Sequence, residues 1–260
     1  MANAEWDDLL WAVNSPSLFV DEEERLGLVD PVDVVVERNG KVGHYFESLI
    51  ECWLERIRGC EIIAHRQQVI EAGKTLGELD FVFRDEEGRL NHWETAVKFY
   101  LCDPENRVDG SCFIGPNTAD TLERKYRRLT EHQLPLSERL HPGVTIRRAF
   151  VKGRIYRNPF HQETDSVAVL NPQHLRGRWL RLGQLDWLDE IEQGGPCGYR
   201  VLAKPYWLHS APFEAVDVNN LRAGLRSHFE GSKKSIHVGI SRDDLEIERL
   251  FVVADEWPHL

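Results

Sequence analysis

Residues Leu76 to Leu101 read LGELDFVFRDEEGRLNHWETAVKFYL and predict two β-strands joined by a tight turn. Apolar residues alternate with polar or small ones in both halves of this segment, which is the period-two pattern of a half-buried strand. Between the halves, residues 85–89 (DEEGR) have the composition of a turn. Gly88 is free to adopt the left-handed conformation that closes a short hairpin loop. We therefore expect a β-hairpin over this segment.

The register of this hairpin places two carboxylates opposite each other. If residues 85 and 89 close the loop, Phe81 faces Trp93 on the apolar side. On the other side, Asp80 then faces Glu94. Directly opposed side chains have Cβ atoms about 5 Å apart, and like charges at that distance destabilise a sheet. A divalent cation between them reverses the sign of the effect.

Further charged residues continue this face of the hairpin. Glu78 lies two residues from Asp80, and Lys98 lies four residues from Glu94. Three carboxylates and one ammonium on one face suit a divalent-metal site. A second interpretation is a sheet face that simply meets water, and a register slip of one residue separates the pair. Spacing alone leaves both interpretations open.

Composition indicates a globular protein. The chain has 260 residues, 42% hydrophobic and 29% charged, which is enough for one elaborated domain or two. A net charge of −11 argues against coating nucleic acid through bulk electrostatics, although a local basic groove remains compatible with it. The five cysteines form no C-x-x-C pair, so we expect neither a disulfide framework nor a zinc cluster. This pattern suits a protein of the reducing cytoplasm. We expect no signal peptide and no membrane span.

Two helices flank the hairpin in the predicted order. Residues 42–58 form a strongly amphipathic helix that carries Glu47 on a polar face, and residues 61–70 follow as a strand. Residues 118–130 form a second helix with the densest basic patch of the chain, namely Arg124, Lys125, Arg127 and Arg128. Such a patch suits phosphates. It equally suits a helix surface balanced by neighbouring acids.

The remaining segments predict shorter elements. Residues 4–14 form a helix, followed by an acidic segment and a proline-containing link to Gly40. Residues 145–156 read as two strands with a bend at Gly153, and the C-terminal part mixes short strands with helices near 186–192 and 218–229. Arg176, Arg178 and Arg181 around Trp179 suit either stacking on nucleotides or an ordinary surface. The histidines show no metal-ligand spacing.

The order of these elements resembles the core of the PD-(D/E)XK nuclease superfamily. That order is a helix with Glu47, a strand, a strand with Gly77-Glu78-Leu79-Asp80, a strand from Glu94 to Lys98, a helix and a strand. More closely, five segments resemble a bacterial family of unknown function assigned to that superfamily: GHYFESLIECWL, GELDFVF, HWETAVKFYL, GPNTADTLERK and KPYWL. The superfamily core corresponds to about residues 41–157, and the family resemblance runs nearly to the C-terminus.

The resemblance implies an α/β fold. Its restriction-endonuclease-like core is a mixed β-sheet flanked by helices, to which an elaborated C-terminal half is added. The implied division is an N-terminal helical cover at residues 1–40, the nuclease-like core at 41–157, and an α+β extension at 158–260 packed on the core as one domain.

The resemblance also implies a divalent-metal nuclease that uses Mg²⁺ or Mn²⁺ and acts on DNA or RNA. Asp80 matches the aspartate of the second core strand, Lys98 the motif lysine, and Glu47 the glutamate of the first helix. The implied catalytic residues are Asp80, Glu94 and Lys98. The implied metal ligands are Asp80, Glu94, Glu78 and Glu47, and the implied phosphate contacts are Arg124, Lys125 and Arg128.

One position departs from the superfamily motif. The residue two before the lysine, normally acidic, is Ala96 here, and Glu94 lies two residues further upstream. The departure keeps a second hypothesis open, in which a catalytically inactive nuclease-like scaffold binds nucleic acid or a protein partner. A third is a structural subunit that uses its aromatic C-terminal half as an interface. The sequence predicts no oligomeric state.

Overall fold

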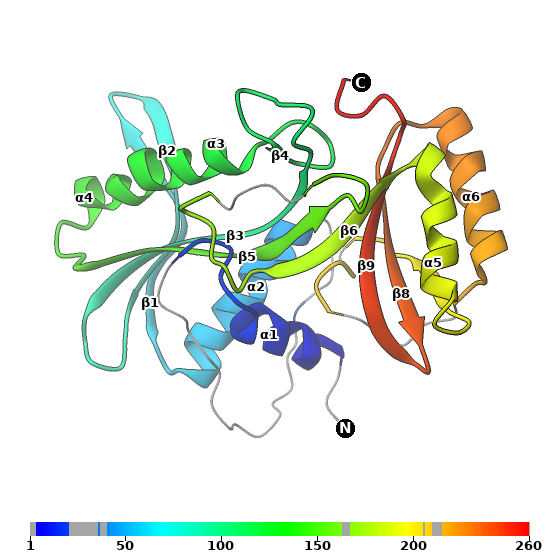
Figure 1. The fold of residues 1–260 in the computed structure, drawn as a ribbon. Helices are drawn as coiled ribbons and strands as arrows, with labels where there is room; N and C mark the ends of the chain where they lie inside the picture. Colours follow the sequence, from blue (N-terminus) through cyan, green and yellow to red (C-terminus); the bar gives the residue numbers. More distant parts are fainter. Residues whose placement is uncertain are drawn as a thin grey trace. The chain divides into compact units, whose positions relative to one another are not determined.

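The structure, a computed structural model, describes residues 4–20, 36, 41–162, 167–204, 206–209 and 215–259. It is a mixed α/β fold with mixed β-sheet flanked by helices (Figure 1). The chain divides into two compact units. Unit 1 contains residues 1–98, 123–153 and 167–174, and unit 2 contains residues 99–122, 154–166 and 175–260. The acidic segment that follows the first helix lies outside the described residues, and the division into 1–40, 41–157 and 158–260 stays a prediction.

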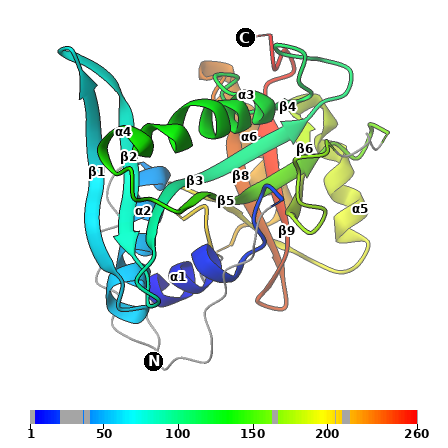
Figure 2. The same ribbon diagram turned by 90° about the vertical axis from the view of Figure 1, so that its left-hand side faces the viewer.

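Unit 1 has the strand order β1-β2-β3-β5. Its strands are β1 (Glu61–Glu71), β2 (Lys74–Arg84), the first part of β3 (Leu90–Cys102) and the first part of β5 (Ile146–Arg157). Its helical elements are α1 (Ala4–Asn14), α2 (Val42–Cys52), η1 (Trp53–Ile57), α3 (Leu122–Arg127), η2 (Arg128–Gln133), η3 (Leu134–Leu136) and α4 (Ser137–Leu140). In Figures 1 and 2, α1 and α2 lie on one side of β3 and β5, and α3 and α4 lie on the other.

The hairpin of β2 and β3 has the predicted register. Asp85 N donates to Arg89 O at 3.0 Å, which closes the loop as expected. Gly88 has φ of 79°, a conformation that glycine adopts without the steric cost of a Cβ atom. Phe81 pairs with Trp93, as the sequence predicts.

Apolar layers on both faces hold this hairpin in place. On one face Trp93 stacks on Phe150 at 5.1 Å between ring centroids, and Trp53 of η1 lies 6.0 Å from Trp93. On the other face, Val82 of β2 packs in one cluster with Leu136 of η3. Because helical segments cover both faces, His92, Glu94 and Thr95 of β3 are buried, whereas Glu78 and Arg84 of β2 remain exposed.

Gly153 allows β3 and β5 to approach closely. Its φ is 154°, and a Cβ atom there would lie 1.8 Å from the Lys98 carbonyl oxygen. The predicted interruption at this glycine is wrong, because β5 runs through it as a single strand. The glycine serves close packing of two backbones instead of ending a strand.

Unit 2 continues from the ends of β3 and β5. The end of β5 pairs in parallel with β6, β6 pairs in parallel with β9, and β8 pairs antiparallel with β9 and β7. The elements are β4 (Phe113–Ile114), β6 (Leu175–Arg181), η4 (Leu182–Trp187), α5 (Leu188–Glu192), β7 (Gly198–Val201), α6 (Val218–Gly231), β8 (Ile236–Arg242) and β9 (Leu245–Val253). Leu188 of α5 and Leu221 and Leu225 of α6 pack into the core of this unit.

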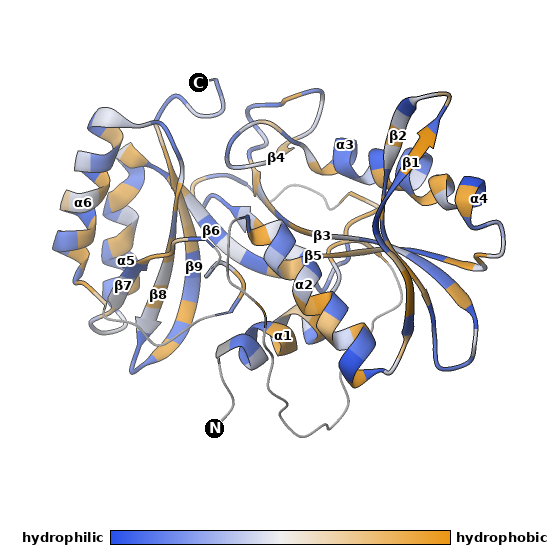
Figure 3. Cartoon of the chain, turned by 180° about the vertical axis from the view of Figure 1, so that it is seen from behind, coloured by the Kyte–Doolittle hydropathy of each residue, from blue (hydrophilic) through white to orange (hydrophobic). Residues whose placement is uncertain are grey.

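The hydropathy of α6 fits this packing, because hydrophobic and hydrophilic residues alternate along it (Figure 3). The Asp217 side chain caps the helix by accepting from Asn219 N and Asn220 N. Within the described part of the chain, no helix is long and apolar enough to cross a membrane.

Candidate functional site

The predicted carboxylate pair lies where β2 and β3 stop pairing. The backbone pairing joins residues 81–84 to residues 90–93, one position short of Asp80 and Glu94. Beyond it, side chains take over the hydrogen bonding between the strands. Thr95 N donates to Asp80 Oδ2 at 2.7 Å, and Asp80 N donates to Glu94 Oε1 at 3.4 Å. The two acids are therefore neighbours across the strands, as the sequence analysis expects.

Glu94 is fully buried and its carboxylate is held by two further side chains. His92 Nε2 lies 2.9 Å from Glu94 Oε1, and because a carboxylate only accepts, this nitrogen carries the proton. Gln133 Nε2 of η2 donates to Glu94 Oε2 at 2.5 Å. The buried charge thus has hydrogen-bond donors on both oxygens, which offsets much of its desolvation.

Gly77 explains how η2 and η3 reach this position. A Cβ atom on Gly77 would lie 2.5 Å from Leu136 Cδ1, so the helical segment packs against bare backbone of β2. His132 Nε2 forms a hydrogen bond with Leu76 O at 3.1 Å in the same region. The glycine of the GELD segment therefore has a structural reason, which is to let Gln133 approach Glu94.

The surroundings of Asp80 disfavour its charged form. Burial and then the Glu94 carboxylate raise the pKa of Asp80 from its usual 3.8 to about 7. Glu47 also raises this pKa, whereas the hydrogen bond from Thr95 N and the charge of Lys125 lower it. Near neutral pH, the Asp80 carboxyl is consequently poised between its protonated and ionised forms. A bound cation would favour the ionised form.

The other two acids predicted as metal ligands, Glu47 and Glu78, have different surroundings from Asp80 and Glu94. Glu47 of α2 accepts from Arg66 Nε at 2.9 Å, and Arg66 lies in β1 with a positive φ of 52°. Because this arginine is paired to Glu47, the charge of the glutamate is largely offset. Glu78 is exposed on β2, and Lys98 is half-buried on β3.

The predicted phosphate contacts lie on α3 and at the start of η2. Lys125 is half-buried and its charge reaches Asp80, whereas Arg124 and Arg128 are exposed. All three belong to unit 1, as do the two acids. Positive charge is thus available near the pair without neutralising it completely.

The side chains around the pair fit a hard divalent cation. The Oε1 atom of Gln133 is buried and accepts no hydrogen bond, although the same amide donates to Glu94. Together with Asp80 and Glu94 it supplies oxygen donors, which Mg²⁺ and Mn²⁺ prefer. The pair itself offers two carboxylates.

A group of three metal-ligating residues lies elsewhere in the chain. Among the described residues, only Asp103, Glu105 and His161 of unit 2 bring three His, Cys, Asp or Glu ligand atoms within 4.8 Å of one another. This partly buried Asp/Glu/His cluster could hold a metal ion, although its residues are not the ones that the sequence predicts.

The sequence analysis did not predict several residues around the Asp80–Glu94 pair or in the Asp103, Glu105 and His161 cluster. The spacing of His92 and Glu94, two residues apart on one strand, is a usable signal for their contact. Gln133 and His161 carry no such signal, because tertiary packing alone brings them to their partners. Trp179 is fully buried and its Nε1 donates to Cys102 O at 3.0 Å, so it is not available to stack on a nucleotide.

A comparison with family models gives one match, to a domain of unknown function (DUF1853) over residues 20–253. No curated protein and no solved structure matches the chain. The functional conclusion therefore depends on the geometry and charge of the site.

Proposed function

The chain belongs to the DUF1853 family, and we propose that it is a divalent-metal-dependent nuclease whose site is built on Asp80 and Glu94. In this proposal residues 41–157 form a restriction-endonuclease-like core of the PD-(D/E)XK superfamily, in a bacterial, cytoplasmic protein. The substrate is DNA or RNA. The order of α2, the β2–β3 hairpin, α3 and β5 is compatible with that core.

The observation that carries the proposal is the electrostatic state of the carboxylate pair. Two acids on adjacent strands meet in a covered position, and the pKa of Asp80 is raised to about 7 by burial and by Glu94. Perturbed pKa values of this kind gather at functional sites because burial and like charges are costly elsewhere. A buried amide oxygen without a hydrogen-bond partner, Gln133 Oε1, adds a third donor beside Glu94.

Asp80, Glu94 and the Gln133 amide oxygen would hold the cation, with Glu78 or Glu47 assisting. When bound, Mg²⁺ or Mn²⁺ supplies charge neutralisation at the scissile phosphate and a more acidic water. The hydrogen bond from Thr95 N fixes the orientation of the Asp80 carboxylate.

The basic residues have separate roles in this proposal. The ammonium group of Lys98 orients the attacking water and stabilises negative charge that develops on the phosphate. Arg124, Lys125 and Arg128 hold the flanking phosphates, contacts that position a strand without reading its sequence.

A specific observation favours the inactive scaffold as second candidate. Ala96 occupies the position where the motif normally carries an acid, and it is 9% exposed in a largely buried strand. Glu94 already receives two side-chain hydrogen bonds, so it is stable without a cation. The second candidate binds nucleic acid through the basic residues of α3 and η2 and does not cleave it.

Cleavage assays on the full chain separate the two candidates. Labelled single- and double-stranded DNA and RNA are incubated with Mg²⁺, Mn²⁺ or EDTA. We expect cleavage that EDTA abolishes and that Asp80→Asn lowers at least about 100-fold. Glu55→Gln is the matched control, because Glu55 is an exposed acid of the same unit. Cleavage that Asp80→Asn leaves unchanged contradicts the nuclease proposal. Binding without cleavage, lost in Arg124→Ala and Arg128→Ala, supports the scaffold.

A further inference from the structure

Three metal-ligating residues of unit 2 converge from two loops. Asp103 and Glu105 follow the end of β3, and His161 follows the end of β5. One ligand atom from each lies within 4.8 Å of the others. Their side chains differ in exposure, because Asp103 is fully buried, His161 is 9% exposed and Glu105 is 71% exposed.

The imidazole ring of His161 is mostly buried, yet it lacks the hydrogen bonds expected of a buried polar group. Its buried Nδ1 atom has no hydrogen-bond partner. This nitrogen lies 3.7 Å from Asp103 Oδ1, and Nε2 of the same ring lies 3.7 Å from Glu105 Oε2. Both distances exceed the upper limit of about 3.2 Å for an N–H···O hydrogen bond. The ring therefore faces two carboxylates without bonding to either.

The spacing is close to that of two ligands on one ion. With bonds of about 2.1 Å at the tetrahedral angle, two ligands of a zinc ion lie about 3.4 Å apart. The separation between Nδ1 and Asp103 Oδ1 differs little from this value. Because the Glu105 side chain is largely exposed, it is free to move the short distance that completes the set.

Asp103 is held in position by hydrogen-bond donors to both of its carboxylate oxygens. Arg181 donates to Asp103 Oδ2 at 2.9 Å, and Asn106 Nδ2 donates to the same oxygen at 3.0 Å. The backbone N–H groups of Glu105 and Asn106 donate to Oδ1 at 3.1 and 3.3 Å. Such outer contacts orient a ligating carboxylate, and Arg181 offsets one of the two negative charges.

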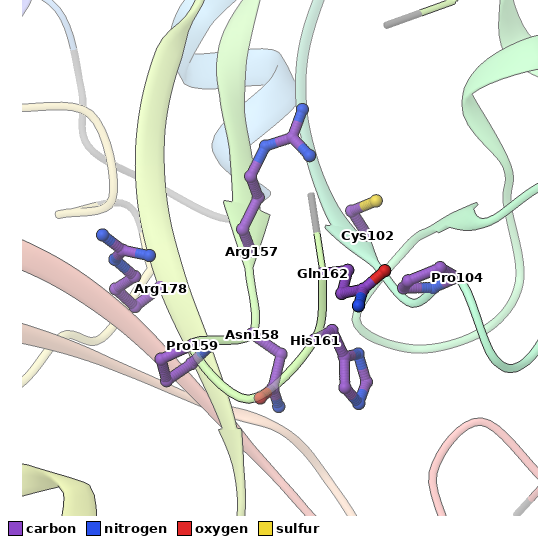
Figure 4. Close-up of a pocket in the computed structure, with 8 residues that line it drawn as sticks. All are labelled: Cys102, Pro104, Arg157, Asn158, Pro159, His161, Gln162 and Arg178. Carbon is purple, nitrogen blue, oxygen red and sulfur yellow. The ribbon is translucent and has the colours of Figure 1, made fainter. Parts of the chain in front are cut away.

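A pocket of unit 2 gives access to His161. It has a volume of about 160 Å³ and is lined by His161 together with Pro104, Asn158 and two arginines, Arg157 and Arg178. Figure 4 shows His161 beside Asn158 in this pocket. The pocket thus gives an ion an entry path to the His161 ligand.

We propose that Asp103, Glu105 and His161 form a binding site for a divalent transition-metal ion of the zinc class. The imidazole selects such an ion over Mg²⁺ and Ca²⁺, which take oxygen ligands. Three protein ligands leave one coordination position open, as in catalytic zinc sites. The site is independent of the nuclease proposal, because its ligands belong to unit 2 and the acid pair belongs to unit 1.

Metal titration of the full, EDTA-treated chain tests the site. Zn²⁺ binding is measured by calorimetry and Co²⁺ binding by visible absorption, which reports ligand geometry without any enzymatic assay. We expect Glu105→Gln to weaken binding at least about tenfold, and His161→Ala to remove the absorption band. The control variants are Glu190→Gln, which changes an exposed acid of the same unit, and His228→Ala, which changes a half-buried histidine of that unit. Asp80→Asn retains the band.

The exposed Glu105 side chain keeps the test decisive even if His161→Ala folds poorly, because its replacement disturbs no packing. Circular dichroism verifies the fold of each variant. Zn²⁺ binding by Glu105→Gln with the affinity of the unmodified chain overturns the site. Equal competition by Mg²⁺ overturns the assignment to the zinc class.

Discussion

Replacing Asp80 by Asn should stabilise the metal-free protein, and the gain should grow with pH. The substitution removes one charge from a pair of buried carboxylates. It retains an oxygen that accepts the hydrogen bond from Thr95 N. In the folded chain the pKa of Asp80 is raised to about 7, from a usual value of 3.8. The folded state therefore binds more protons than the unfolded state between these two values, and its stability falls as pH rises through that window.

The size of the effect follows from this difference in pKa. Each pKa unit corresponds to about 1.4 kcal/mol, so a shift of about three units amounts to about 4 kcal/mol when both states are ionised. The neutral amide accepts a weaker hydrogen bond than the carboxylate, which lowers the gain. We therefore expect Asp80→Asn to gain about 2 to 4 kcal/mol at pH 8, and less at pH 5.

Urea unfolding in EDTA at the two pH values measures this gain. Glu55→Gln serves as the control, and its free energy of unfolding should change by less than about 0.5 kcal/mol at both values. A variant at Asp80 that is no more stable than the unmodified chain at pH 8 would refute the electrostatic account of the pair. So would a gain of equal size at pH 5 and pH 8.

Three further substitutions each test a contact within one of the two units. Gln133→Leu removes a hydrogen-bond donor from the buried Glu94 carboxylate and should cost about 1 to 3 kcal/mol in urea unfolding, whereas no cost would show that η2 does not hold the acid. Asp217→Ala removes the cap of α6 and should cost about 1 kcal/mol, largely restored by Asp217→Ser; equal loss in both would exclude capping as the cause. Gly153→Ala places a methyl group against the Lys98 carbonyl and should greatly lower the yield of folded protein, so a normal melting temperature would contradict the close approach of β3 and β5.

The local parts of the hairpin were predictable from the sequence. Turn chemistry in residues 85–89 and alternation on either side determine the register, and Phe81 pairs with Trp93 as expected. Asp80 and Glu94 are neighbours for the same reason, since register alone brings adjacent strand positions together. The resemblance to a family of unknown function agrees with the family match over residues 20–253, and the assignment to the nuclease superfamily stays a prediction.

The contacts made by distant segments were not predictable from the sequence. Gln133 reaches Glu94 because the helical segment of η2 and η3 packs over the bare backbone of Gly77. No pattern in the sequence predicts that contact. His161 meets Asp103 because two loops of unit 2 converge. Glu47 accepts a hydrogen bond from Arg66 of β1, a contact that its place in α2 does not indicate. Periodicity describes faces of single elements, whereas these contacts arise from tertiary packing.

The pKa of Asp80 itself, followed by NMR of its carboxyl carbon with and without Mg²⁺, tests the cation-binding pair most directly. Without divalent ions we expect an apparent pKa of about 7. With saturating Mg²⁺ it should fall to the ordinary aspartate value of about 4 or below, because the cation favours the ionised carboxylate. A pKa near 4 in the absence of metal, or one near 7 that Mg²⁺ leaves unchanged, would contradict the proposal that Asp80 and Glu94 hold a cation.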